Sequence, residues 1–295
     1  MKTITKEKQM RKTHAMAALA AAAALVLTGC GNQSDGASSA SPKDSDKPAA
    51  ESVTKLKVGV SPVPHGDILR FVQDNLAADA GLDIEVVDYQ DYVLPNKALA
   101  EGDLDANYFQ HQPYLDSQVA EFGYDFFAFG GVHIEPLGVY SEKLKSVSEL
   151  KEGDKIGVSN DPANQARGLR LLEQAGAIKL KDTGGADPTI SDLAEDTPIK
   201  VELEQIEPKL LAVNLPDFAL SVINGNYAID AGLSPSKDAL KLESGENNPY
   251  ANFLVTTSAD KTNPAIVKLD ELLHSAEVRE YITSTWSDGS VIPAF

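Results

Sequence analysis

Residues 56–87 read LKVGVSPVPHGDILRFVQDNLAADAGLDIEVV and join two kinds of apolar pattern. Residues 56–60 and 84–87 are short, mostly apolar runs of the kind found in buried strands. Between them, apolar side chains recur at helical spacing until Gly81, at Ile68, Leu69, Val72, Leu76 and Ala80. The stretch therefore predicts a β-α-β unit, in which a helix over 68–80 connects two strands.

Strands and helices continue to alternate along the chain. A strand at 155–158 is followed by Asp161, a typical N-cap residue, and by a helix at 162–174 that begins with proline. An extended segment at 132–140 is interrupted by Pro136. We expect further strands at 124–129, 199–203, 218–223 and 252–256, and further helices at 95–100, 114–122, 264–273 and 276–285. This pattern predicts an α/β fold with mainly parallel sheets.

The first 29 residues have the order of a secretory signal. Five Lys and Arg residues precede an apolar run at 15–27, and the tetrapeptide LTGC follows at 27–30. The run is too short for a transmembrane helix, which needs ~20 apolar residues. LTGC resembles the lipobox of bacterial lipoproteins, in which the cysteine is acylated; the alternative is an ordinary signal with a chance cysteine. We predict a lipoprotein signal peptide at 1–29 and acylation of Cys30, with palmitate among the chains.

Cys30 is the only cysteine, so its acylation would leave no thiol for a disulfide, a metal site or a nucleophile. Residues 30–52 are rich in Ser, Ala and Asp and contain no aromatic side chain, which predicts a flexible tether with a reach of roughly 25–30 Å. The remaining residues, 53–295, are enough for one large or two moderate domains.

The chain is strongly acidic, with 44 Asp and Glu against 26 Lys and Arg and a formal net charge of −18. Removal of the signal peptide takes away five basic residues and one acidic residue, which leaves −22. An anionic surface repels phosphate backbones and anionic lipid head groups. We therefore expect no nucleic-acid partner, and attachment to the membrane through the lipid anchor.

Residues 107–114, NYFQHQPY, form the first candidate binding stretch. They concentrate aromatic and amide groups where a strand is expected to end and a helix to begin, which is where open α/β sheets bind ligands. The alternative is that Phe109 and Tyr114 are ordinary core residues and that His111 only starts the helix.

Residues 159–167, SNDPANQAR, form the second candidate stretch. Asn164 and Arg167 are three residues apart and share one face of the helix start. An arginine beside the free N–H groups of a helix start suits a carboxylate ligand. The alternative is an exposed arginine with no binding role.

Enzymatic motifs are not found in the sequence. It contains no H-E-x-x-H, G-x-S-x-G, P-loop or G-x-G-x-x-G motif. His133 and Glu135 would face the same side of an extended segment and could form half of a metal site, but such lone pairs are common. We predict that the protein is not an enzyme and uses neither a metal nor a cofactor.

Several blocks of sequence together resemble the NlpA/MetQ-type methionine-binding lipoproteins. In order, they are DYVLPN at 91–96, AEGDLDAN at 100–107, FQH at 109–111, PYLD at 113–116, NDP at 160–162 with Asn164 and Arg167, KLKD at 179–182, ALSVIN at 219–224 and NPY at 248–250. The resemblance extends from about residue 57 to the C-terminus. On these blocks the chain is identified as a member of that family.

The resemblance implies a two-lobed, periplasmic-binding-protein-like (type II) fold with a ligand cleft between the lobes. We expect lobe one to contain residues 53–141 and 236–295, and lobe two to contain residues 142–235. The implied function is that of the substrate-binding lipoprotein of an ABC importer. It would be held at the extracytoplasmic face of the cell membrane by its lipid anchor, and would deliver L-methionine to the permease and its ATPase.

The resemblance also implies roles for individual residues. The thioether would lie among aromatic side chains, Asn164 and Arg167 would hold the α-carboxylate, and Asn224 would make a polar contact from the second lobe. The aromatic set is Tyr92, Phe109, His111 and Tyr114. Sulfur–aromatic contacts of ~0.3–1.5 kcal/mol each and an arginine fork fit these roles.

Two positions depart from the family pattern. Ala166 stands where many members have glycine, and residues 132–135, VHIE, replace a more apolar segment. Either change could alter the depth of the pocket. Two alternatives therefore stay open: a methionine-containing dipeptide or related apolar amino acid as the ligand, or a surface adhesin or sensor that transports nothing.

Overall fold

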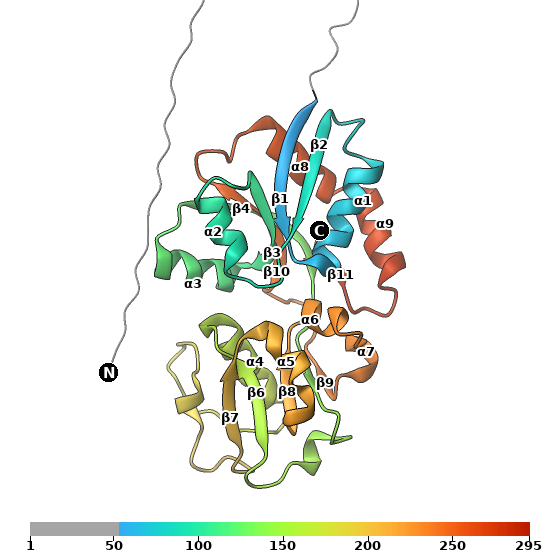
Figure 1. The fold of residues 1–295 in the computed structure, drawn as a ribbon. Coiled ribbons are helices and arrows are strands. Elements are labelled where there is room, and N and C mark those ends of the chain that lie inside the picture. The colour runs from blue at the N-terminus through green and yellow to red at the C-terminus, as the bar shows by residue number, and fades with distance from the viewer. Residues whose placement is uncertain (1–52) are drawn as a thin grey trace, which may run out of the picture. The chain divides into compact units, whose positions relative to one another are not determined.

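The β-α-β unit predicted from residues 56–87 is present in the computed structural model, which describes residues 53–295 (Figure 1). It consists of β1 (Thr54–Val60), α1 (Asp67–Asn75) and β2 (Leu82–Asp88), and β1 pairs with β2 in parallel. The helix ends five residues earlier than predicted, because Leu76 and Ala77 both donate to the Val72 carbonyl and the regular ladder stops there. The predicted signal peptide, Cys30 and the tether lie outside the described residues.

The first sheet has six strands in the order β11-β4-β10-β3-β1-β2. β3 (Ala106–His111) is parallel to β1, whereas β10 (Ala251–Thr257) is antiparallel to both β3 and β4 (Phe126–Ile134), and β11 (Ile292–Pro293) is antiparallel to β4. Helices α1, α8 (Pro264–Leu273) and α9 (Ala276–Thr285) share one buried core with this sheet. A second core lies under α2 (Leu94–Ala100) and α3 (Gln112–Phe122).

The second sheet has five strands in the order β7-β6-β8-β5-β9. β6 (Lys155–Ser159) is parallel to β7 (Glu202–Ile206) and β8 (Leu220–Ile223), and β5 (Gly138–Tyr140) is antiparallel to β8 and β9 (Lys241–Leu242). The helices of this part are α4 (Pro162–Gln174), α5 (Pro208–Val213), α6 (Gly225–Asp230) and α7 (Pro235–Asp238). A separate core, which includes Ile156, Leu169 and Leu220, holds α4 against the sheet.

The α/β fold class is confirmed, but the prediction of mainly parallel sheets is wrong. Among the strand pairs of residues 53–295, antiparallel pairs slightly outnumber parallel ones. Four of the five antiparallel pairs involve β5 or β10, which enter their new sheets in the reverse direction, and the fifth joins β11 to β4. The order of strands and helices along a sequence does not contain this information.

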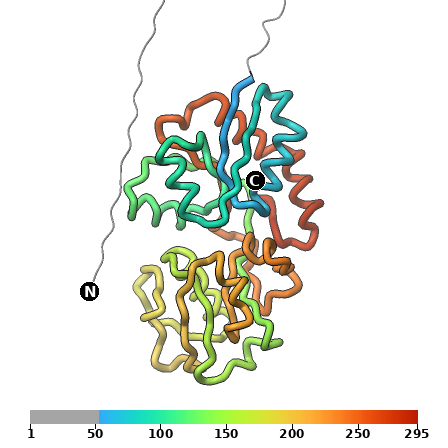
Figure 2. The backbone as a smooth tube through the Cα atoms, viewed as in Figure 1, coloured from blue at the N-terminus to red at the C-terminus, as the bar shows by residue number. Residues whose placement is uncertain are grey.

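The chain crosses between the two sheets at residues 135–137 and again at 243–250 (Figure 2). Pro136 separates β4 from β5, so the extended segment predicted at 132–140 is divided between the two sheets. The boundaries expected from the sequence leave β5 and β9 in lobe one, although both strands pair within the second sheet. We therefore propose that the two crossings are the lobe boundaries.

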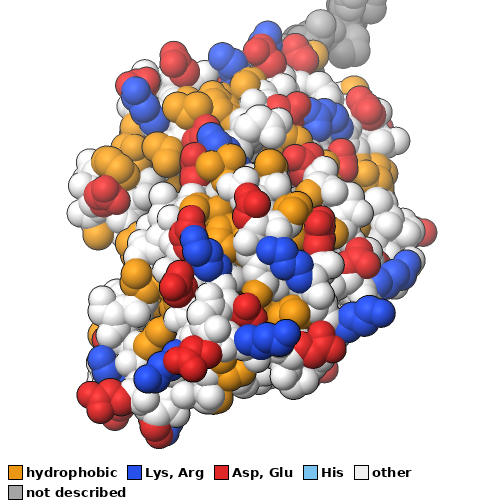
Figure 3. Space-filling model, turned by 60° about the horizontal axis from the view of Figure 1, so that its bottom comes forward, with side chains coloured by type: hydrophobic (Ala, Val, Ile, Leu, Met, Phe, Trp, Pro, Cys, Tyr) orange, Lys and Arg blue, Asp and Glu red, His pale blue; other side chains and the backbone are white. Residues whose placement is uncertain are grey.

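Charged side chains are mixed on the surface that Figure 3 shows, where Lys and Arg lie among Asp and Glu. Within residues 53–295, none of the helices has both the length and the apolar character needed to span a bilayer.

Candidate functional site

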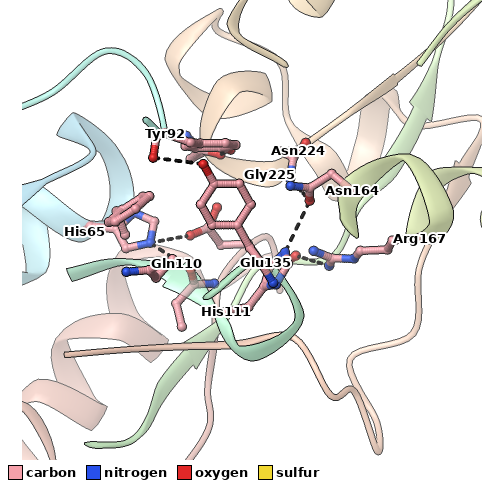
Figure 4. Close-up of a pocket in the computed structure, with 13 residues that line it drawn as sticks. His65, Tyr92, Gln110, His111, Glu135, Asn164, Arg167, Asn224 and Gly225 are labelled. Atoms are coloured by element: carbon pink, nitrogen blue, oxygen red, sulfur yellow. Dashed lines mark hydrogen bonds and ion pairs between the residues drawn. The ribbon is translucent and has the colours of Figure 1, made fainter. Parts of the chain in front are cut away.

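The seven residues predicted from the sequence line one cavity, which both sheets and their helices contribute to (Figure 4). It contains about 340 Å³ of space free of atoms, part of it open to solvent. Six lining residues were not predicted as ligand contacts. The full lining is His65, Tyr92, Phe109, Gln110, His111, Tyr114, Glu135, Asn164, Arg167, Asn224, Gly225, Asn226 and Asn252.

One wall of the cavity is aromatic. The ring centroids of Tyr92, Phe109 and Tyr114 lie 5.7–6.1 Å from one another. The Tyr114 hydroxyl donates to the Tyr92 carbonyl at 2.9 Å, and the Tyr92 hydroxyl donates to Asn226 on α6 at 2.6 Å. Burial raises the pKa of both phenols, so they stay neutral. The wall therefore offers ring faces to a ligand and keeps its hydroxyls occupied.

His111 connects this wall to helix α4. Its Nδ1 accepts from the Tyr114 backbone N–H and caps α3, as expected for a residue that starts a helix. Its Nε2 lies 3.2 Å from Asn164 Oδ1 and donates to it, because Nδ1 is the acceptor. Burial, assisted by the charge of Arg167, lowers the pKa of His111 to about 3. The ring is therefore neutral and part of the apolar lining at physiological pH.

Asn164 is held in the first turn of α4. The N-cap residue Asp161 accepts from the Asn164 backbone N–H at 2.8 Å, and the Asn164 amide also donates to the Asp161 carboxylate. Its Oδ1 accepts from Asn224 Nδ2 at 2.8 Å as well as from His111. This amide therefore ties α4, β3 and the end of β8 together at the cavity wall.

Arg167 is buried, with 4 % of its surface exposed, so the alternative of an exposed arginine is wrong. Its Nε and Nη2 donate to the two oxygens of Glu243 at 3.0 and 2.5 Å, and Nη2 also donates to the Glu135 carbonyl at 3.0 Å. The guanidinium carbon lies 4.0 Å from the centre of the Tyr250 ring. The remaining nitrogen, Nη1, has no hydrogen-bond partner among residues 53–295.

Glu135 is a buried carboxylate in the same cavity. Its Oε1 lies 2.8 Å from His133 Nε2 and 3.2 Å from His65 Nε2. A charged Glu135 carboxylate can only accept hydrogen bonds, so the proton of the His133 ring is assigned to Nε2, and Nδ1 accepts from the Tyr108 hydroxyl. A side chain in place of Gly225 would begin 2.7 Å from Glu135 Cβ, so the glycine leaves this carboxylate accessible.

The same three residues, His65, His133 and Glu135, have ligand atoms within 4.8 Å of one another and could hold a divalent cation. The hydrogen bonds favour a different role. His133 directs an N–H rather than a lone pair toward Glu135, and a metal ligand would need that lone pair. The two histidines instead orient the Glu135 carboxylate, which can accept hydrogen bonds from a ligand. The sequence had indicated His133 and Glu135 as a pair, whereas His65 comes from a distant segment and was missed.

The buried histidines should make the stability of the protein depend on pH. Burial lowers the pKa of His65 to about 4 and that of His111 and His133 to about 3, against ~6.5 in the unfolded chain. The unfolded state therefore binds more protons below pH 6.5, and stability is lost as the pH falls from there toward about 4 for His65 and about 3 for His111 and His133. Between pH 7 and 5 each histidine should lower the free energy of unfolding by roughly 2 kcal/mol.

Urea unfolding at a series of pH values measures this loss, and His65→Gln is the control because it removes one of the three groups. The raised pKa of His274 has the opposite effect, but it is common to both proteins and cancels in the comparison. Equal slopes of stability against pH in the two proteins would contradict the prediction.

Comparison with known proteins agrees with the resemblance found in the sequence. The model of the NlpA lipoprotein family matches residues 56–295. The D-methionine-binding lipoprotein MetQ of Escherichia coli is 40% identical over 80% of this chain and 87% of its own length, and that of Yersinia pestis is 36% identical over 90% and 93%. A solved nutrient-binding protein from Burkholderia cenocepacia bound to methionine is 43% identical, with a TM-score of 0.78 over 81% of this chain and all of its own. The solved methionine-binding protein MetQ has 38% identity and a TM-score of 0.76 over 82% and 98%.

Proposed function

Because the chain belongs to the NlpA lipoprotein family, we propose that it is the substrate-binding lipoprotein of an ABC importer and captures free methionine. The observation that carries the proposal is one small cavity that combines an aromatic wall with a buried arginine and a buried carboxylate. Opposite charges a short distance apart suit the zwitterionic end of an amino acid, and the aromatic wall suits an apolar side chain. The captured amino acid is then passed to the permease and its ATPase.

The carboxylate of methionine binds Arg167 in this proposal. Glu243 and the Glu135 carbonyl occupy Nε and Nη2, which leaves the two N–H groups of Nη1 for the ligand. Asn164 and Asn224 form the adjacent wall and supply amide groups.

The ammonium group binds Glu135. Arg167 already has Glu243 as its partner, so Glu135 is the cavity carboxylate with room for a ligand cation. Burial raises the pKa of Glu135, while the nearby His65 and Arg167 oppose that shift and favour its charged form. The resemblance implied only a polar contact from Asn224, and Glu135 is the residue that we propose as the ammonium acceptor.

The thioether lies against Tyr92, Phe109 and Tyr114, with His111 as a neutral neighbour. Sulfur–aromatic contacts stabilise such an arrangement by ~0.3–1.5 kcal/mol each. A dipeptide would hold its two charged ends one residue further apart, whereas Arg167 and Glu135 line the same cavity and Arg167 donates to the Glu135 carbonyl at 3.0 Å, which favours a single amino acid.

Calorimetric titration of delipidated, refolded protein tests the proposal. Both enantiomers of methionine belong in the panel, because the resemblance implied L-methionine whereas the curated relatives carry D-methionine in their names. Leucine, glutamine and glycyl-methionine complete it. We expect methionine to bind at least tenfold more tightly than these three. Tighter binding of glycyl-methionine would overturn the assignment.

Attachment through Cys30 is the second part of the proposal, because relatives in this family are lipoproteins. Mass spectrometry of the mature N-terminus should find acyl chains on Cys30, and Cys30→Ser should lose them while methionine binding stays unchanged. An unmodified Cys30 in protein that sediments with membranes would contradict this anchor.

A further inference from the structure

The segment from Glu243 to Tyr250 returns the chain from the second sheet to the first, and both of its ends contact Arg167. Glu243 accepts from Nε and Nη2 of the guanidinium, and the Tyr250 ring lies against its face, 4.0 Å from the guanidinium carbon. Neither residue lines the ligand cavity. Glu243 therefore reaches the proposed carboxylate site through Arg167, whereas Tyr250 reaches it through Arg167 and through the His111 ring, whose centroid lies 5.1 Å from that of Tyr250.

Glu243 also binds both chain crossings. Its Oε2 accepts from the Leu137 backbone N–H at 3.2 Å in the first crossing and from Asn248 Nδ2 at 2.9 Å in the second. Arg167 itself donates to the Glu135 carbonyl in the first crossing. The guanidinium, although carried by α4 of the second lobe, is thus fixed to both segments that join the lobes.

The ion pair is well matched to this position. The Glu243 side chain is 16 % exposed and that of Arg167 is 4 % exposed, so water screens the pair only weakly. Burial disfavours the charged form of Glu243, yet the hydrogen bonds and charge of Arg167 lower its pKa overall. A side-on pair through Nε and Nη2 fixes the plane of a guanidinium as well as its position.

We propose that Glu243 and Tyr250 are positioning residues: they hold Arg167 with Nη1 directed at the ligand carboxylate and link occupation of that site to the two crossings between the lobes. The proposal rests on the proposed function, and it assigns a role to residues outside the cavity. Without the pair, the guanidinium can rotate, and ligand binding has to fix it. When two lobes close on a ligand, the segments that join them absorb the motion. The contacts of Glu243 and Arg167 with the two crossings therefore connect the carboxylate site to the segments that would move.

Glu243→Gln tests the first residue. It keeps the side-chain shape but cannot accept two hydrogen bonds side-on. We expect affinity for methionine to fall roughly 10- to 100-fold, the range for a lost hydrogen bond to a charged group. Affinity for methioninamide, which lacks the carboxylate, should change less than threefold. Unchanged methionine binding, or an equal loss for both ligands, would overturn the positioning role.

Tyr250→Phe and Tyr250→Leu form a matched pair for the second residue. The phenylalanine variant keeps the ring over the guanidinium and should bind methionine like wild type. The leucine variant should lose roughly 2- to 30-fold, the range for a cation–π contact. Similar affinities for the two variants would remove Tyr250 from the proposal.

A measurement without ligand separates this inference from the proposed function. In wild type the Arg167 Nε proton should resonate downfield and exchange slowly, and Glu243→Gln should shift it upfield, with Arg167→Lys used to assign the signal. An unshifted signal overturns the positioning role even if methionine binds. Absence of methionine binding by wild type, with the signal shifted as expected, overturns the proposed function alone.

Discussion

Replacing Arg167 with alanine should weaken methionine binding roughly 30-fold to several thousandfold. The substitution leaves the ligand carboxylate in a buried site without its cation, which costs about 2–5 kcal/mol. Titration of both proteins with methionine measures the loss. Arg170→Ala is the matched control, because Arg170 lies on the same helix with its side chain 41 % exposed and paired with Asp187, and its loss should not change binding.

The alanine variant also leaves the part-buried Glu243 without its cation, which destabilises a protein by up to about 3–5 kcal/mol when the pair is fully buried. A double variant, Arg167→Met with Glu243→Gln, removes both charges and avoids this unpaired carboxylate. It should fold and should still fail to bind methionine. If either variant binds methionine as wild type does, the carboxylate does not bind Arg167.

Replacing Glu135 with glutamine should weaken methionine binding on the order of 30- to 1000-fold, from a loss of roughly 2–4 kcal/mol. Glutamine keeps a side-chain oxygen for the N–H groups of His65 and His133, so the network beneath the cavity retains its acceptor. What disappears is the negative charge that faces the ligand ammonium. Calorimetric titration with methionine measures the effect.

The analogue 4-(methylthio)butanoate, which lacks the amino group, provides the control for Glu135. It should bind wild type much more weakly than methionine does, and Glu135→Gln should not weaken it further. A variant that loses both ligands to the same degree would place the effect in the fold of the cavity rather than in a contact with the ammonium group.

Much of the local structure could be predicted from the sequence. The strand at 155–158 and the helix at 162–174 lie within one residue of their predicted bounds, and the helices at 264–273 and 276–285 have the predicted bounds. Apolar spacing, an N-cap such as Asp161 and a proline in the first turn act over about ten residues, so they can be identified from the chain alone. Of the seven predicted cavity residues, Asn164 and Arg167 lie in the first turns of the helix at 162–174, and the other five lie near the ends of β2, β3 and β8, where binding side chains are expected.

The tertiary structure decided which side chains meet. His65 and Glu135 are 70 residues apart along the chain, and Arg167 and Glu243 are 76 residues apart. The side chains of each pair are nevertheless in direct contact. Likewise, β5 and β9 are too short for the sequence to show which sheet they join. They belong to the second sheet because β5 pairs with β8 and β9 pairs with β5. Contacts of this kind depend on strand order, direction and register between distant segments, which arise from packing of the whole domain and leave no periodic signal in the sequence.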